Sequence, residues 1–108
     1  MNDEKWSKAE KTIARRAFEV AYERECENLA GRLKDKAGGI KEPRDLWLVH
    51  DFLSEQLKRI EEKYDFRYSM LILVFALLLK EGWLRESELA GISEDKMEKI
   101  RYLANPKR

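Results

Sequence analysis

The sequence predicts an all-helical protein that associates with a second copy of itself. Three observations lead to this fold class. Apolar residues recur at helical spacing, only five glycines and two prolines are present, and 40% of the 108 residues are charged. This mixture is typical of helices with charged surfaces and apolar stripes, and not of a turn-rich sheet protein. The length suits a single domain over residues 1–108.

The first helix is expected to run from Ser7 to about Lys36. Ser7 and Glu10 form a capping box, in which the hydroxyl accepts from the amide three residues on and the carboxylate reaches back. Gly38-Gly39 then ends the helix. One apolar stripe follows the helix and consists of Ala9, Ile13, Ala17, Val20, Ala21, Leu29 and Leu33. Such a helix is roughly 43 Å long, more than the rest of this chain can cover, so the stripe favours a dimer.

The second helix is expected from about Arg44 to Lys63, with Pro43 in its first turn. Its main stripe consists of Leu46, Val49, Leu53, Leu57, Ile60 and Tyr64. Leu48 and Phe52 widen the apolar arc to about half of the circumference, more than one neighbouring helix needs. We therefore expect Leu46, Phe52 and Leu53 in a dimer interface.

Two shorter helices complete the expected fold. A nearly uniformly apolar helix over about residues 67–81 ends at Gly82 and forms the centre of a local core. A short turn at 86–90 precedes a last helix from its N-cap Ser93 to Ala104, and Asn105-Pro106 ends that helix.

Composition argues against several classes of protein. The 22 Lys and Arg residues nearly balance the 21 Asp and Glu residues, whereas proteins that bind nucleic acid or anionic membranes usually carry a basic surplus. The longest apolar run, Met70 to Leu79, has half the length of a membrane-spanning helix. A single cysteine, Cys26, suits a reducing compartment, and residues 1–5 do not resemble a signal peptide. We expect a cytoplasmic protein without membrane insertion.

The sequence gives little support for an enzyme. With one His and one Cys, the chain cannot build a four-ligand His/Cys zinc site, so we expect no metal or other cofactor. His50-Asp51 is similar to a dipeptide of metal phosphohydrolases, but the further histidines are missing. No glycine-rich phosphate loop is present. We expect no catalytic residues.

A DNA-binding regulator is a weaker alternative. Residues 88–93 are similar to the turn of a helix-turn-helix, and Lys96, Lys99 and Arg101 follow on the last helix. The spacing is wrong, however, because the alanine and the glycine of the turn are adjacent here. A capped helix with a polar face is the simpler interpretation, and we expect no nucleic-acid partner.

Trp47 is the anomaly of the second helix. It projects about 100° from the apolar stripe, with Asp51, Ser54 and Lys58 as neighbours and His50 at the edge of the same face. An aromatic residue in such surroundings either packs against the first helix or is an exposed anchor for a partner, because Trp is enriched at binding hot spots.

The sequence resembles a known family, the fluorescence recovery proteins of cyanobacteria. The most distinctive motif is Trp47-x-x-His-Asp-Phe-Leu-Ser, within residues 45–54. Further similar segments are 6–7, 9–10, 21–25, 63–65, 74–76, 78–82 and 95–96, so the resemblance covers nearly the whole chain. It implies an all-helical dimer whose long helices form a body, here about residues 7–63, and whose shorter helices form a head, about 66–105.

The resemblance also implies a function. Such proteins bind the orange carotenoid protein, chiefly its C-terminal domain, and speed the return of the photoactivated form to the resting orange form. Non-photochemical quenching at the phycobilisome then ends, without covalent chemistry. Carried over by position, the partner-binding residues are Trp47, His50, Asp51, Leu73 and Lys99, and Leu46 lies in the dimer interface.

Two departures from the family pattern leave an alternative open. Leu57 occupies the position of a family arginine, and the neighbouring Lys58 is rotated by about 100° and cannot replace it. Leu73 replaces an aromatic residue. Both suit a divergent homologue with the same helical dimer, a different protein partner and no role with a carotenoid protein.

Overall fold

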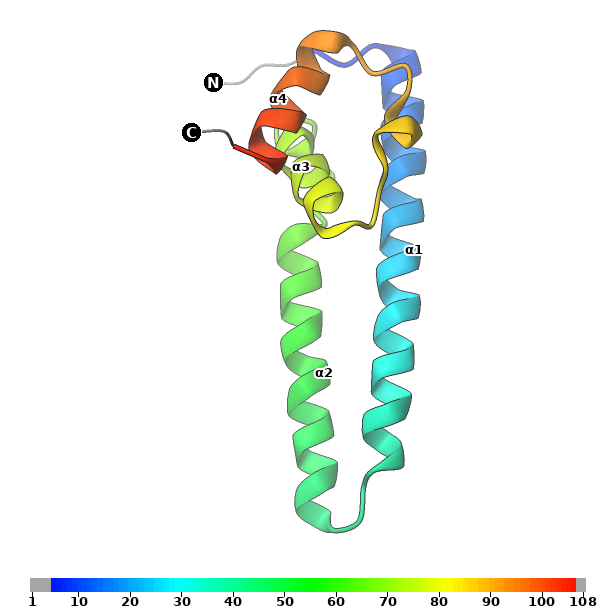
Figure 1. Cartoon of the computed structure of the whole chain (residues 1–108), viewed down its shortest axis with the longest axis vertical. Coiled ribbons are helices and arrows are strands. Elements are labelled where there is room, and N and C mark those ends of the chain that lie inside the picture. The colour runs from blue at the N-terminus through cyan, green and yellow to red at the C-terminus, as the bar shows by residue number, and fades with distance from the viewer. Residues whose placement is uncertain (1–4, 107–108) are drawn as a thin grey trace.

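The computed structural model describes residues 5–106, and its regular structure is helical. Helices α1 (Lys8–Gly38) and α2 (Pro43–Lys63) run antiparallel and form what we call the hairpin. Helix α3 (Leu71–Glu81), the short 3-10 helix η1 (Glu86–Leu89) and helix α4 (Glu94–Ala104) form what we call the head. The head packs beside the first half of α1, and the hairpin turn lies at the other end of a 53 × 31 × 22 Å body (Figure 1).

Helix α1 begins as the sequence predicts. The Ser7 hydroxyl accepts from the Glu10 amide at 3.0 Å, and the Glu10 carboxylate accepts from the Ser7 amide at 2.9 Å. The helix continues two residues past the expected end and stops at the Gly38-Gly39 pair. The capping box and the glycine pair therefore set both ends of this helix.

The buried face of α1 differs from the predicted stripe. Ala17, Ala21 and Leu29 are buried as expected, but Ala9 is exposed, and Ile13, Val20 and Leu33 are only half-buried. Glu10 and Ala14, which the prediction left out, are buried instead. The helix faces the head through small residues, which allow a close approach. The predicted stripe was therefore only partly correct, because it left out Ala14 and included large residues that the head does not fully cover.

Helix α2 begins at Pro43, one residue earlier than expected, and ends at Lys63 as predicted. The Asp45 carboxylate accepts from the Lys41 and Glu42 amides and satisfies donors that precede the first turn. Proline is favoured at this position because an N–H group in the first turn would have no acceptor within the helix.

Helix α3 begins four residues later than predicted, at Leu71. Residues 68–70 form a turn before it, and Arg67 pairs with Asp65 instead of entering the helix. The aromatic rings of Phe66 and Tyr68 pack on each other, and Phe66 also packs on Phe18 of α1. These tertiary contacts override the helical pattern of the segment. Gly82, at φ +87°, ends the helix in the left-handed conformation that glycine tolerates.

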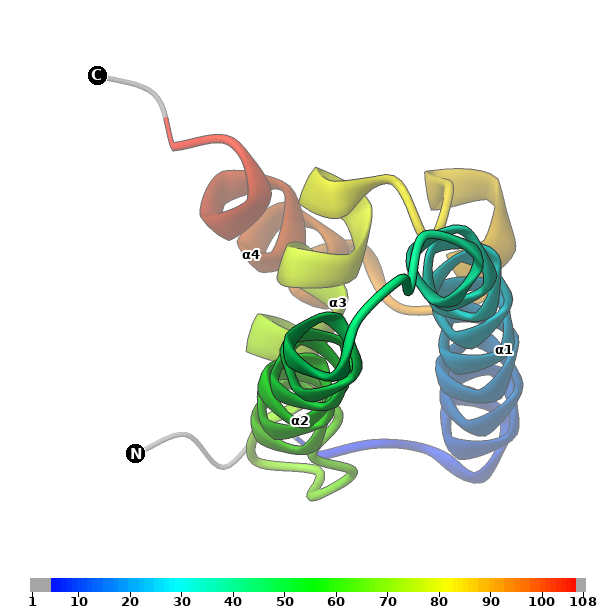
Figure 2. The ribbon, with the colours of Figure 1, turned by 90° about the horizontal axis from the view of Figure 1, so that it is seen from below.

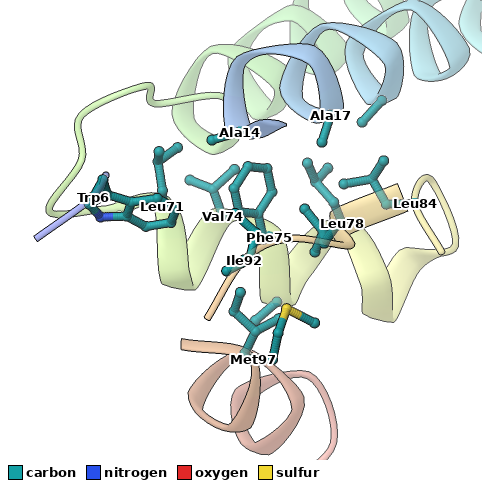
Figure 3. Packing of buried hydrophobic residues seen from close by; sticks show 14 residues of the cluster. Trp6, Ala14, Ala17, Leu71, Val74, Phe75, Leu78, Leu84, Ile92 and Met97 are labelled. Atoms are coloured by element: carbon teal, nitrogen blue, oxygen red, sulfur yellow. The ribbon is translucent and has the colours of Figure 1, made fainter. Parts of the chain in front are cut away.

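The core joins the two ends of the sequence. Trp6, Ala14 and Ala17 contribute from the N-terminal side, while α3, the following segment and α4 contribute large apolar side chains (Figure 3). Its fully buried large members are Leu71, Phe75, Leu78, Leu89 and Ile100. The head is therefore not a separate layer, because the first half of α1 completes its core.

Three polar clusters fasten the head to the hairpin. Lys63, at the end of α2, pairs with Glu25 of α1 and with Glu81 of α3. The Tyr64 hydroxyl donates to Glu25 at 2.8 Å, and burial together with this carboxylate raises the pKa of Tyr64 well above its usual range. One ammonium group therefore links three helices.

The second cluster pairs Arg24 with Glu88. The guanidinium of Arg24 donates to both carboxylate oxygens at 2.8 and 2.6 Å, and to the Trp83 carbonyl at 2.9 Å. These hydrogen bonds, with one from the Arg85 amide, lower the pKa of Glu88 to about 2. The bidentate geometry fixes η1 against α1.

In the third cluster, Glu10 reaches the start of α4. Its carboxylate accepts from the Ser93 amide at 2.8 Å and from the Lys96 ammonium at 3.2 Å, and both charged residues are buried. Ser93 caps α4 as the sequence predicts. One carboxylate thus closes the first turns of two helices that lie far apart in the sequence.

Candidate functional site

The outer half of the hairpin leaves its apolar side chains exposed. Between residues 30 and 59 no side chain is buried, although nearly the whole stretch is helical. The exposed large apolar residues of this region are Leu46, Trp47, Leu48, Leu53 and Leu57. A pair of helices without a buried core is not stable alone in water, so this surface is suited to contact with another protein.

Trp47, His50 and Asp51 lie together on the outer side of α2, near the hairpin turn. The Trp47 side chain is 61% exposed, so it does not pack against α1. This exposure argues against the first of the two alternatives that the sequence left open, and the role of Trp47 as an anchor for a partner stays a prediction. His50 Nδ1 lies 3.3 Å from Asp51 Oδ1, and both side chains are exposed. The three residues present a ring, an imidazole and a carboxylate to solvent.

Leu46, Leu53 and Leu57 form a second surface, which we call the leucine stripe. Their spacing of seven and four residues places them on one side of α2, roughly 100° from Trp47. Phe52, also predicted for the dimer interface, is half-buried and packs within the chain beneath the Lys36 and Arg32 side chains. It flanks α1 rather than the leucine stripe.

Leu73 and Lys99 lie in the head. Leu73 is on the exposed side of α3, and Lys99 is exposed on α4. Because the head and the hairpin turn are at opposite ends of the long axis, one chain does not bring these two residues together with Trp47 (Figure 1). The sequence prediction grouped them without this separation.

The basic residues of α4 are largely occupied. Lys96 is buried against Glu10, and the Arg101 guanidinium donates to Glu86 and Glu94 at 3.0 and 2.8 Å. These two carboxylates raise the pKa of Arg101 above its ordinary value. Two of the three cations on which the DNA-binding alternative depends are therefore committed to carboxylates within the chain.

Residues 5–106 contain neither a metal-binding cluster nor a membrane-spanning helix. In this part of the chain no three His, Cys, Asp or Glu side chains come together as a group that could hold a metal ion. No helix in the same range combines the length and the apolarity that crossing a membrane requires. The features that stand out there are exposed apolar and aromatic side chains, of the kind that is enriched in protein interfaces.

Sequence reasoning missed some of the exposed surface. The sequence predicts the last helix only as a capped helix with a polar face, but its Tyr102 and Leu103 side chains are 60% and 42% exposed. The available signal was an aromatic residue on the polar side of a short helix. It resembles the signal that singled out Trp47.

An all-helical hairpin with a small head and exposed apolar surfaces is an architecture suited to a regulatory protein, and the comparisons agree. Residues 6–104 match a family described as photoprotection regulator fluorescence recovery protein. The chain belongs to the fluorescence recovery protein family.

Individual relatives support this assignment. The fluorescence recovery protein of Synechocystis sp. is 44% identical over 99 residues, which are 92% of this chain and 91% of that protein. The solved structure of the Fremyella diplosiphon fluorescence recovery protein is 45% identical, with a TM-score of 0.87 over 93% of this chain and 98% of that one. The solved structure of the Synechocystis fluorescence recovery protein is 44% identical, with a TM-score of 0.88 over 93% of this chain and 98% of that one. These likenesses confirm the predicted all-helical fold.

Proposed function

We propose that this protein binds the photoactivated orange carotenoid protein through the C-terminal domain of that protein, and accelerates its return to the inactive orange form. Quenching at the phycobilisome then ends. Membership of a photoprotection regulator family supports this function, and one observation carries it: Trp47 is exposed beside His50 and Asp51. An indole that no intrachain contact explains is suited to a partner's pocket.

The proposed action needs no covalent step. The protein lowers the barrier of recovery if it binds the relaxing conformation of its partner more tightly than the photoactivated one. The Trp47 ring supplies contact area, while Asp51 and His50 supply directed polar contacts at its edge. The working compartment of this interaction is the cytoplasm.

We further propose a homodimer formed across the leucine stripe. Leu46 and Leu53 are exposed on one side of a hairpin that has no buried residue between 30 and 59. A second copy removes both stripes from water in a self-complementary contact. Such a dimer also provides two Trp47 surfaces and two heads, so Leu73 and Lys99 of one copy need not act with Trp47 of the same copy.

A second candidate function is supported by Leu57. This residue is 53% exposed and continues the leucine stripe, where the resemblance implies an arginine. An always-charged, bidentate group is then absent from the partner surface. The alternative is a homologue with the same helical dimer and a different protein partner, outside carotenoid photoprotection.

The deciding measurement is the dark recovery of photoactivated orange carotenoid protein, followed by absorbance with and without this protein. We expect a clear acceleration, and we expect Trp47→Ala to abolish it while the chain stays folded. Leu48→Ala is the matched control, because it truncates an exposed neighbour on another side of α2. No acceleration by a folded wild-type dimer would rule out the first function in favour of the second.

A further inference from the structure

A groove in the head lies outside the surfaces described above. Its volume is about 640 Å³, and it opens between the last turn of α3, the segment after it and the last turn of α4. Leu79, Leu84 and Ala104 give it an apolar lining, and the largely exposed Tyr102 ring contributes to its wall. A hollow of this size holds one or two leucine-sized side chains.

The charges around this groove are predominantly positive. Lys80, Arg85 and Arg101 line it against one carboxylate, that of Glu86. Glu86 is held by Arg101, which Glu94 also neutralises. Among residues 5–106 no carboxylate forms an ion pair with Lys80 or Arg85. Lys80 and Arg85 are exposed and can pair with an incoming anion beside an apolar lining, although the Glu88 carboxylate already attracts Arg85.

The groove is separate from the hairpin. Viewed along the long axis, α3 lies between α2 and α4, so the last turn of α4 is on the side of the head away from α2 (Figure 2). The leucine stripe, Trp47, Leu73 and Lys99 contribute nothing to its lining. A contact confined to the leucine stripe uses none of the residues that line this groove.

We propose that this groove binds an acidic, apolar segment of a partner protein. Leucine-like side chains of the segment cover Leu79, Leu84 and Ala104, and its carboxylates pair with Lys80 and Arg85. The charge around the groove selects for acidic segments, because like charges on a basic segment repel these two cations. Tyr102 adds a rigid aromatic contact of the kind that is enriched in interfaces. This site is independent of the recovery function proposed above.

The test uses two synthetic peptides, an octapeptide of alternating glutamate and leucine and its twin of alternating lysine and leucine. Each is titrated into the full-length ¹⁵N-labelled protein, and binding is followed by the amide resonances. We expect saturable shifts at Leu84, Tyr102 and Ala104 with the acidic peptide, and none with the basic twin. Lys80→Glu with Arg85→Glu weakens binding at least roughly tenfold, because two exposed ion pairs become repulsive.

The matched control is Lys34→Glu with Lys41→Glu. It makes the same change in net charge on exposed residues near the far end of the hairpin, and we expect unchanged peptide affinity. Equal binding of both peptides, or full binding to the Lys80/Arg85 variant with a native circular dichroism spectrum, would overturn the proposal. Groove amides that shift with protein concentration in the absence of peptide would instead make a second copy of this chain the occupant.

Discussion

Replacing Glu10 by glutamine tests the contact that joins α1 to α4. The Glu10 carboxylate accepts from the amides of Ser7 and Ser93 at 2.9 and 2.8 Å, and from the Lys96 ammonium at 3.2 Å. A glutamine side chain has only one acceptor oxygen, and its NH₂ group faces a donor on the other side. The variant therefore leaves at least one buried donor unsatisfied and Lys96 without its counter-charge.

The expected loss of stability is large for a substitution that replaces one carboxylate oxygen by an NH₂ group. Breaking a buried ion pair by removal of one partner costs about 3–5 kcal/mol, and both side chains here are less than 10% exposed. A domain of this size loses roughly 4 °C of melting temperature for each kcal/mol. We therefore expect Glu10→Gln to melt more than about 10 °C below the wild type.

Thermal unfolding gives the melting temperature and urea unfolding gives the free energy of unfolding, both at pH 7 and followed by circular dichroism. One fixed protein concentration is used, because the proposed dimer would make stability depend on concentration. Glu19→Gln is the control, since Glu19 is exposed on the same helix and only weakly paired with Arg15 at 3.9 Å. We expect that control to change the free energy of unfolding by less than about 0.5 kcal/mol. A Glu10→Gln variant as stable as Glu19→Gln would refute the reasoning.

The pH dependence gives a second check on Glu10. Burial by itself raises the pKa of Glu10, but the hydrogen bonds from Ser7, Ser93 and Lys96 outweigh it and hold the pKa below the ordinary 4.5. A lowered folded-state pKa contributes stability above the unfolded value, and this contribution is lost as pH falls through the folded value. The gap between wild type and Glu10→Gln is therefore constant near neutral pH and narrows below about pH 4.5. A gap that stays constant down to pH 2 would contradict this assignment.

Four further substitutions test other features. Leu46→Glu places a charge in the proposed dimer interface, so we expect a shift toward monomer in sedimentation equilibrium; an unchanged dimer mass would contradict the interface. Phe75→Ala empties a fully buried core site and should cost about 3–5 kcal/mol in urea unfolding; a loss below 1 kcal/mol would show that the core does not depend on this ring. Gly31→Ala should gain about 0.5–1 kcal/mol, because nothing lies near the added methyl group in the helix interior. Gly91→Ala should lose more than about 1 kcal/mol, because φ is +103° and the new Cβ would lie 2.5 Å from Ile13; equal melting temperatures of the two glycine variants would refute both assignments.

Local signals predicted most of the helix boundaries. The Ser7 capping box, the Gly38-Gly39 pair, Gly82 and the Ser93 cap each end or begin a helix through neighbours within four residues. The predicted start of α3 was wrong because aromatic contacts, among them one with Phe18 of α1, hold residues 66–68 outside the helix. Propensity and spacing describe neighbours in the chain, and they do not describe such tertiary contacts.

The same distinction applies to the candidate site. The helical wheel places Trp47 away from the apolar stripe, so the sequence allowed two alternatives, packing against the first helix or exposure to solvent. The structure shows that Trp47 is exposed. The head groove and the Lys63 cluster could not be predicted, because they combine residues from three separate elements. The partner roles of Leu73 and Lys99 come from the family resemblance and stay predictions.

The position of the core also affects how the chain can be made. Trp6, Ala14 and Ala17 find their core partners among residues 71–100, so no early part of the sequence can bury its apolar side chains by itself. During synthesis, α1 and α2 leave the ribosome before the residues that cover them exist. Closing such a long loop costs entropy before any contact compensates for it, and this slows folding relative to helical bundles with local contacts. The newly made chain therefore depends on its last quarter, α4 included, to become a folded protein.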